Sequence, residues 1–171
     1  MNGFFYINGY RDFWQMCRHN YRLFSNKEDN KHYEYKLLNL ILSLNHLYDW
    51  VIKDENLSLY IRNQCEKKFY PYSDRSNFNT KQYLVRKLSN RGKHFKQVEN
   101  DPSQGVELQK AFCADMPDAI AGNAFSRETR MFHYVEHDDV KYDVESLCKE
   151  LFDEWKFFFE DIESVEKHNQ V

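Results

Sequence analysis

Apolar side chains recur at three- and four-residue steps in three long stretches, and this period limits the folds open to the chain more than any other feature. It is the period of a helix with one apolar face, so we predict helices over residues 10–24, about 30–54 and 143–165. The positions that define them are Tyr10, Phe13, Trp14, Cys17, Tyr21 and Phe24; Leu37, Leu40, Ile41, Leu44, Leu47, Tyr48 and Val51; and Val144, Leu147, Cys148, Leu151, Trp155, Phe158, Phe159 and Ile162. With only five Gly and three Pro to make turns, the chain is predicted to be mainly α.

Two shorter stretches add to these helices. Residues 57–69 hold apolar side chains in looser helical register, and Pro71 prevents the helix from continuing. After a polar segment, Thr80 is placed to cap a helix that runs to about residue 95. Trp155 lies at the centre of the last apolar stripe, so we predict that it is buried against the helices at 30–54 and 80–95.

The period changes after the break at residues 100–105, NDPSQG. Residues 106–113 are expected to form a strand, residues 114–127 an irregular loop or short helix, and residues 131–144 a hairpin around Asp138 and Asp139. The predicted fold is therefore mainly α: a four- to five-helix bundle with a small β-hairpin before the C-terminal helix. We expect one domain over residues 1–171, with an irregular or β insertion at about 100–142.

Several functional classes lack support in the sequence. The four cysteines, Cys17, Cys65, Cys113 and Cys148, form no CxxC pair, so reduced and partly buried thiols are expected. No HExxH motif or phosphate-binding glycine loop occurs, which predicts neither a metal site nor a cofactor. The N-terminal residues lack the pattern of a secretory signal, and no apolar run is long enough for a membrane span. A cytoplasmic protein without membrane contact is expected.

Charge is distributed unevenly along the chain. Residues 67–96 contain nine bases and one acid, a local charge of +8 in a chain whose net charge is −3. Residues 138–167 contain eleven acids and four bases, a local charge of −7. Two interpretations stay open: the basic segment attracts a polyanion, or it lies against the acidic C-terminal helix and is neutralised within the protein.

The helix predicted at 80–95 carries a polar face. Helical geometry places Tyr83, Lys87, Asn90 and His94 on one side, flanked by Arg86 and Lys93. Such a face could bind a phosphodiester, with His94 exchanging a proton near neutral pH and the bases stabilising negative charge. The alternative is an ordinary solvated helix surface.

Asn45 and Asp49 form a second polar pair, at the border of the apolar stripe of residues 30–54. A carboxylate at this place could orient His94 or meet a base of the helix at 80–95. It could equally satisfy nearby backbone groups or tyrosine hydroxyls without any chemical role.

Three blocks of sequence carry a resemblance to a known family. LNHLYDWV, LSNRGKHF and KYDVESLCKELFDEWKFFF, in this order, resemble small helical bacterial proteins related to HEPN domains. HEPN domains are helical bundles, usually dimeric, and many are metal-independent endoribonucleases of stress, toxin–antitoxin or phage-defence systems. Their motif is an Arg, often followed by a polar residue, with a His four to six residues beyond.

Carried onto this chain, the motif gives Asn90 as the polar residue and His94 as the histidine. Ser89 stands where the motif has Arg, while Arg86 lies one turn earlier. The resemblance implies that His94 is the general acid and base, that Asn90 positions the phosphate, and that Arg86, Lys87, Arg91 and Lys93 hold the RNA. It also implies a homodimer with His94 near the two-fold axis. Because of Ser89, RNA binding without cleavage stays open, and so does a non-catalytic interaction module whose basic helix docks on an acidic partner.

Overall fold

The computed structural model describes residues 7–26, 32–76, 78–93, 108–111 and 130–168; within these ranges, side chains are described to residue 90 and again over 133–164. The chain divides into a helical unit, residues 1–97 and 147–171, and a second unit, residues 98–146. The described residues form five helices and three strands. The prediction of a mainly α bundle with a β-hairpin before the C-terminal helix is confirmed.

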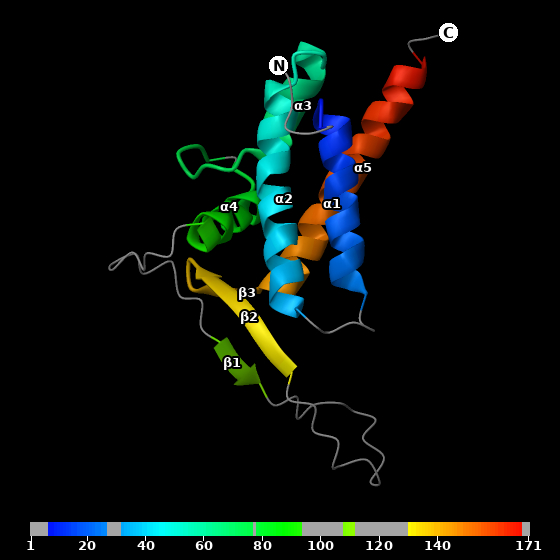
Figure 1. Ribbon diagram of the computed structural model, residues 1–171. Coiled ribbons are helices and arrows are strands. Elements are labelled where there is room, and N and C mark those ends of the chain that lie inside the picture. Colours follow the sequence, from blue (N-terminus) through cyan, green and yellow to red (C-terminus); the bar gives the residue numbers. More distant parts are fainter. Residues whose placement is uncertain (1–6, 27–31, 77, 94–107, 112–129, 169–171) are drawn as a thin grey trace, which may run out of the picture. The chain divides into compact units, whose positions relative to one another are not determined.

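Helix α2 (Tyr33–Lys53) is the central element of the helical unit, in contact with α1 (Tyr10–Ser25) and with the two helices that follow it (Figure 1). Its leucine stripe is buried, as the periodicity predicts. Trp50 lies off that stripe and stacks on Phe13 of α1, with 5.0 Å between ring centroids. The two helices are joined further at Asp54, whose carboxylate accepts a hydrogen bond from the backbone N–H of Tyr10 at 3.0 Å.

Helix α3 (Leu59–Phe69) begins at Ser58, whose hydroxyl accepts a hydrogen bond from the N–H of Ile61. It ends before Pro71, as expected. Helix α4 (Thr80–Lys93) begins differently from the prediction: its capping residue is Asn79, whose Oδ1 accepts from the N–H of Gln82 at 2.8 Å. Thr80 is the first residue inside the helix. Asn79 is the better cap because its amide nitrogen also donates to Glu154 and to the backbone carbonyl of Lys68.

Helix α5 (Val144–His168) supplies the aromatic centre of the helical unit. Trp155 is fully buried and stacks on Phe69 of α3, with 3.7 Å between ring centroids. Its indole N–H donates to the side-chain oxygen of Gln82 in α4 at 3.1 Å, and the amide nitrogen of Gln82 donates to the carbonyl of Leu44 in α2 at 3.2 Å. The predicted burial of Trp155 and its contact with α4 are confirmed, and its closest ring partner comes from α3.

The second unit holds an antiparallel sheet of order β1-β2-β3, formed by Leu108–Ala111, Arg130–His137 and Val140–Asp143. Strands β2 and β3 are joined by Asp138 and Asp139, which both have positive φ angles, 50° and 61°. This two-residue connection is the tight turn that matches the twist of a hairpin. The hairpin prediction is thus confirmed, and β1 falls within the strand expected at 106–113. The loop expected at 114–127 lies outside the described residues.

Candidate functional site

Helix α4 carries most of the residues expected to act on RNA. Asn90 is exposed, whereas Arg86 and Lys87 are half-buried. Arg91 and Lys93 belong to the last turn of α4, but their side chains are not among those described, and His94 lies outside the described residues. Ser89, at the position of the motif arginine, is fully buried. A guanidinium at this position would therefore face the interior of the bundle rather than a bound phosphate.

The first turn of α4 is tied to the acidic helix α5. The side-chain amide of Asn79 donates to Oε2 of Glu154 at 3.1 Å and to the backbone carbonyl of Lys68 at 3.0 Å. Lys81 donates to Oε1 of Glu154 at 2.7 Å and lies 3.2 Å from a carboxylate oxygen of Glu150. These carboxylates raise the pKa of Lys81, the hydrogen bond to Glu154 being the main cause. At Lys81, the basic segment is neutralised by α5, which is one of the two outcomes anticipated from the charge pattern.

Two arginines of the basic segment lie over tyrosine rings, and one of them, Arg75, also forms an ion pair with Glu66. The guanidinium carbon of Arg75 is 4.0 Å from the ring centroid of Tyr70, and that of Arg86 is 4.2 Å from the centroid of Tyr72. The two rings are themselves 5.3 Å apart. Arg75, Tyr70, Tyr72 and Arg86 thus form a continuous arginine–tyrosine ladder along the connection between α3 and α4. Cations that face aromatic rings keep donors free for other partners.

Local hydrogen bonds hold the ladder in place. The backbone N–H of Asn79 donates to the carbonyl of Tyr70 at 2.9 Å, which closes the base of the loop. The hydroxyl of Tyr70 donates to Asp74 at 3.3 Å, and Arg75 forms an ion pair with Glu66 at 2.9 Å. Arg86 donates to the hydroxyl of Tyr72 at 3.4 Å. Contacts within the loop therefore fix the positions of the ladder residues, and Arg86 is the one member of the ladder that belongs to a helix.

Sequence reasoning missed three of the four ladder residues. The sequence pattern singles out neither Tyr70 nor Tyr72, and Arg75 enters only through the charge of the segment. A signal was present, because two tyrosines lie between bases over residues 67–75, KKFYPYSDR. The loop closure that brings Arg75 and Arg86 to the same pair of rings could not be derived from that order.

Asp49 of α2 lies near the same surface. Its carboxylate is 3.9 Å from Nδ1 of His46 and 3.9 Å from the ammonium of Lys53. The interaction with His46 is the main cause of a lowered pKa for Asp49, and the charges of Lys53 and Arg86 add to it. The contribution of Arg86 is the smallest of these, so a contact between Asp49 and a base of α4 stays a prediction. Asn45, one turn earlier, is buried.

The described cysteines are not suited to nucleophilic chemistry. Cys17, Cys65 and Cys148 are buried thiols that belong to no disulfide. Burial raises the pKa of Cys17 to about 12 and that of Cys65 as well, so both thiols stay protonated near neutral pH. Cys113 lies outside the described residues.

The described part of the chain lacks both a cluster of metal ligands and a membrane-spanning helix. Among the described residues, no three His, Cys, Asp or Glu side chains come together as metal ligands would. None of the described helices has both the length and the apolar character that crossing a membrane requires. Comparison of the chain with protein-family models, with curated proteins and with solved structures found no match.

Proposed function

We propose that the protein binds single-stranded RNA through the arginine–tyrosine ladder and the adjoining bases of α4. The observation that carries this proposal is the ladder itself: two guanidinium groups on either side of two tyrosine rings. Proteins that bind single-stranded nucleic acid combine backbone-tracking cations with aromatic rings on which bases stack. Tyr72 is exposed and Arg75 half-exposed, so both are open to a ligand.

The bases next to the ladder extend the same surface. Lys87 follows Arg86 in sequence, and its ammonium lies 5.3 Å from the ring centroid of Tyr83. Arg91 and Lys93 follow on the same helix, and we propose that they contact phosphates as well. The affinity of such a surface comes mainly from counterion release, so it should depend steeply on salt and little on RNA sequence.

A binding titration tests this proposal. Wild-type protein should bind a labelled single-stranded RNA at low salt, and the double variant Arg86→Glu with Lys87→Glu should bind it at least about tenfold more weakly. The matched control is Arg18→Glu with Lys156→Glu, which makes the same change of charge on α1 and α5 and should leave affinity within about twofold. Equal losses in the two double variants would reject the ladder as the binding site.

Cleavage of the RNA is the further part of this proposal, and it rests on the HEPN resemblance. His94 would act as general acid and base, Asn90 would position the phosphate, and Arg86 would stabilise the charge that develops on it. Asp49 and Asn45 would support these residues. Cleavage should persist in EDTA, and His94→Ala should abolish it while leaving RNA affinity unchanged. RNA that stays intact with wild-type protein would limit the function to binding.

A second candidate function is docking on an acidic protein. The contact of Lys81 with two glutamates of α5 favours it, because the same basic segment already accepts an acidic helix within the chain. In the titration above, an unrelated acidic peptide can be added at the same concentration of negative charge as the RNA. Displacement of the RNA by this peptide would favour the alternative. The HEPN resemblance also leads us to propose that the protein is a homodimer.

A further inference from the structure

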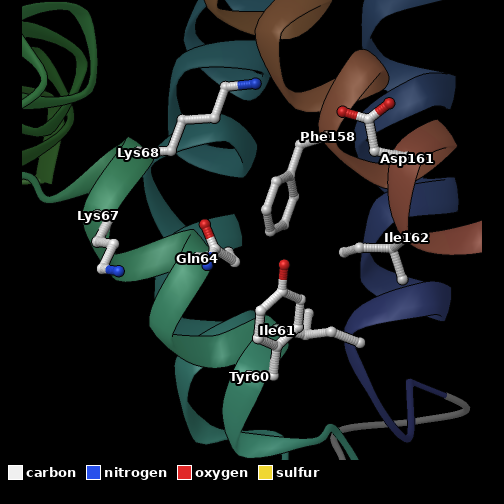
Figure 2. A pocket seen from close by; sticks show the side chains of 8 residues that line it. All are labelled: Tyr60, Ile61, Gln64, Lys67, Lys68, Phe158, Asp161 and Ile162. Atoms are coloured by element: carbon white, nitrogen blue, oxygen red, sulfur yellow. The ribbon is translucent and has the colours of Figure 1, made fainter. Parts of the chain in front are cut away.

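A groove of about 380 Å³ lies between α3 and α5 in the helical unit (Figure 2). Its floor is formed by Ile61, Phe158 and Ile162, each of which is less than a tenth exposed. Tyr60 stands at one edge, with its hydroxyl directed toward the space beneath the Phe158 ring (Figure 2). The two helices close on each other at Phe69 and Trp155, so the groove opens beyond this stack.

The two walls of the groove carry opposite charges. Lys67 and Lys68 line the α3 wall, and Asp161 lines the α5 wall. All three side chains are exposed, and none forms an ion pair with another described residue. The ammonium of Lys68 instead lies 6.0 Å from the ring centroid of Phe158. The α3 wall therefore carries positive charge and the α5 wall negative charge, and no ion pair within the described part of the chain neutralises either.

Large apolar side chains are exposed beside this groove. Tyr60 is 64% exposed, and its neighbour Leu59, the first residue of α3, is 66% exposed. On α5, Phe157 is 58% exposed and directly precedes Phe158 of the groove floor. Apolar side chains that gather on one surface, rimmed by charges, are typical of protein interfaces.

We propose that a second copy of this chain occupies the groove, in a two-fold symmetric pair. A two-fold interface must be complementary to itself, because the same surface of each copy faces the other. The groove meets this condition, since the lysines of α3 in each copy can face Asp161 in the other. The same pairing would cover Tyr60, which is largely exposed in one copy. This interface differs from pairing through α4, and it does not depend on RNA binding.

Charge exchange between two variants tests the proposal. Wild-type protein should be a dimer by light scattering or sedimentation at about 100 µM. Lys67→Glu with Lys68→Glu places acids against Asp161, and Asp161→Lys places a base against the lysines, so each variant alone should weaken the dimer at least about tenfold. Mixed in equal amounts, the two should form a heterodimer, because both contacts then join opposite charges.

Three outcomes would overturn this inference. They are a wild-type monomer at that concentration, a dimer that both variants preserve, and variants that stay monomeric after mixing. The second outcome would direct attention to α4 as the interface. The control Arg18→Glu with Arg22→Glu, which changes two exposed bases of α1, should leave the dimer intact, and circular dichroism should show that each variant is folded. Tyr60→Ser, which changes no charge, should also weaken the dimer by about fivefold or more, since it removes an apolar contact.

Discussion

The first turn of α4 and the turn that follows it carry similar bases with different surroundings. Lys81 lies within hydrogen-bond distance of Glu154, next to the buried pair of Gln82 and Trp155. One turn later, Arg86 lies over the ring of Tyr72 and donates to its hydroxyl. The comparison shows that a block of positive charge in a sequence is not one surface. Lys81 joins two helices of the bundle, whereas Arg86 lies over an aromatic ring at the surface.

The largest effect on stability is expected at Trp155. Replacing a buried Trp by Ala typically costs about 3 to 5 kcal/mol, which is much of the stability of a small domain. Trp155→Ala should therefore be largely unfolded in thermal denaturation monitored by circular dichroism. A stable Trp155→Ala protein that binds RNA weakly would contradict the assignment of this part of the molecule to the core.

Gln82 should have the next largest effect. Gln82→Leu leaves the buried indole N–H of Trp155 without its acceptor, at a cost of about 1 to 3 kcal/mol. In a Trp155→Phe background no indole N–H is present, so Gln82→Leu should cost much less there. Denaturant unfolding of the four proteins measures this coupling. Equal costs in both backgrounds would show that the hydrogen bond does not stabilise the fold.

Lys81 should contribute less, and in a way that depends on pH. Lys81→Met should cost no more than about 1 kcal/mol at pH 7, because the lysine and its partners are partly exposed. The folded state raises the pKa of Lys81 above its ordinary value of 10.5, so the contribution is complete below pH 10.5 and is lost as pH rises through the folded pKa. The wild-type advantage over Lys81→Met should shrink in unfolding measurements above that pH. A stability advantage of the wild type that grows above pH 10.5 would contradict the predicted direction of this pH dependence.

Arg86 should have the smallest effect on stability and a clear effect on binding. Arg86→Gln removes a cation–ring contact at the surface, which is worth about 0.5 to 1 kcal/mol at most. RNA affinity should fall, and the slope of its logarithm against the logarithm of salt concentration should decrease by about 1. Lys81→Met should leave that slope unchanged. If both variants lowered the salt slope by the same amount, the two turns of α4 would contribute equally to RNA binding.

The positions of the helices and of the core were determined by the sequence to a large extent. The apolar stripes of α1, α2 and α5 are long enough to show their period without tertiary information, and Trp155 lies in the centre of one of them. The Asp138–Asp139 turn was also recognisable, because two residues between apolar runs favour a tight hairpin. Helix starts are less certain from sequence, since Asn79 and Thr80 are both good caps and the packing against Glu154 favours Asn79.

Only the tertiary structure decided which bases are neutralised and which meet aromatic rings. Charge is additive along a sequence, but the field at a side chain depends on distances of a few ångströms between segments far apart in the chain. Lys81 and Glu154 are 73 residues apart, and Arg86 and Tyr72 are 14 apart across a closed loop. Composition therefore located the basic segment, while the folding of α5 and of the α3–α4 loop against it decided which bases meet carboxylates and which lie over tyrosine rings.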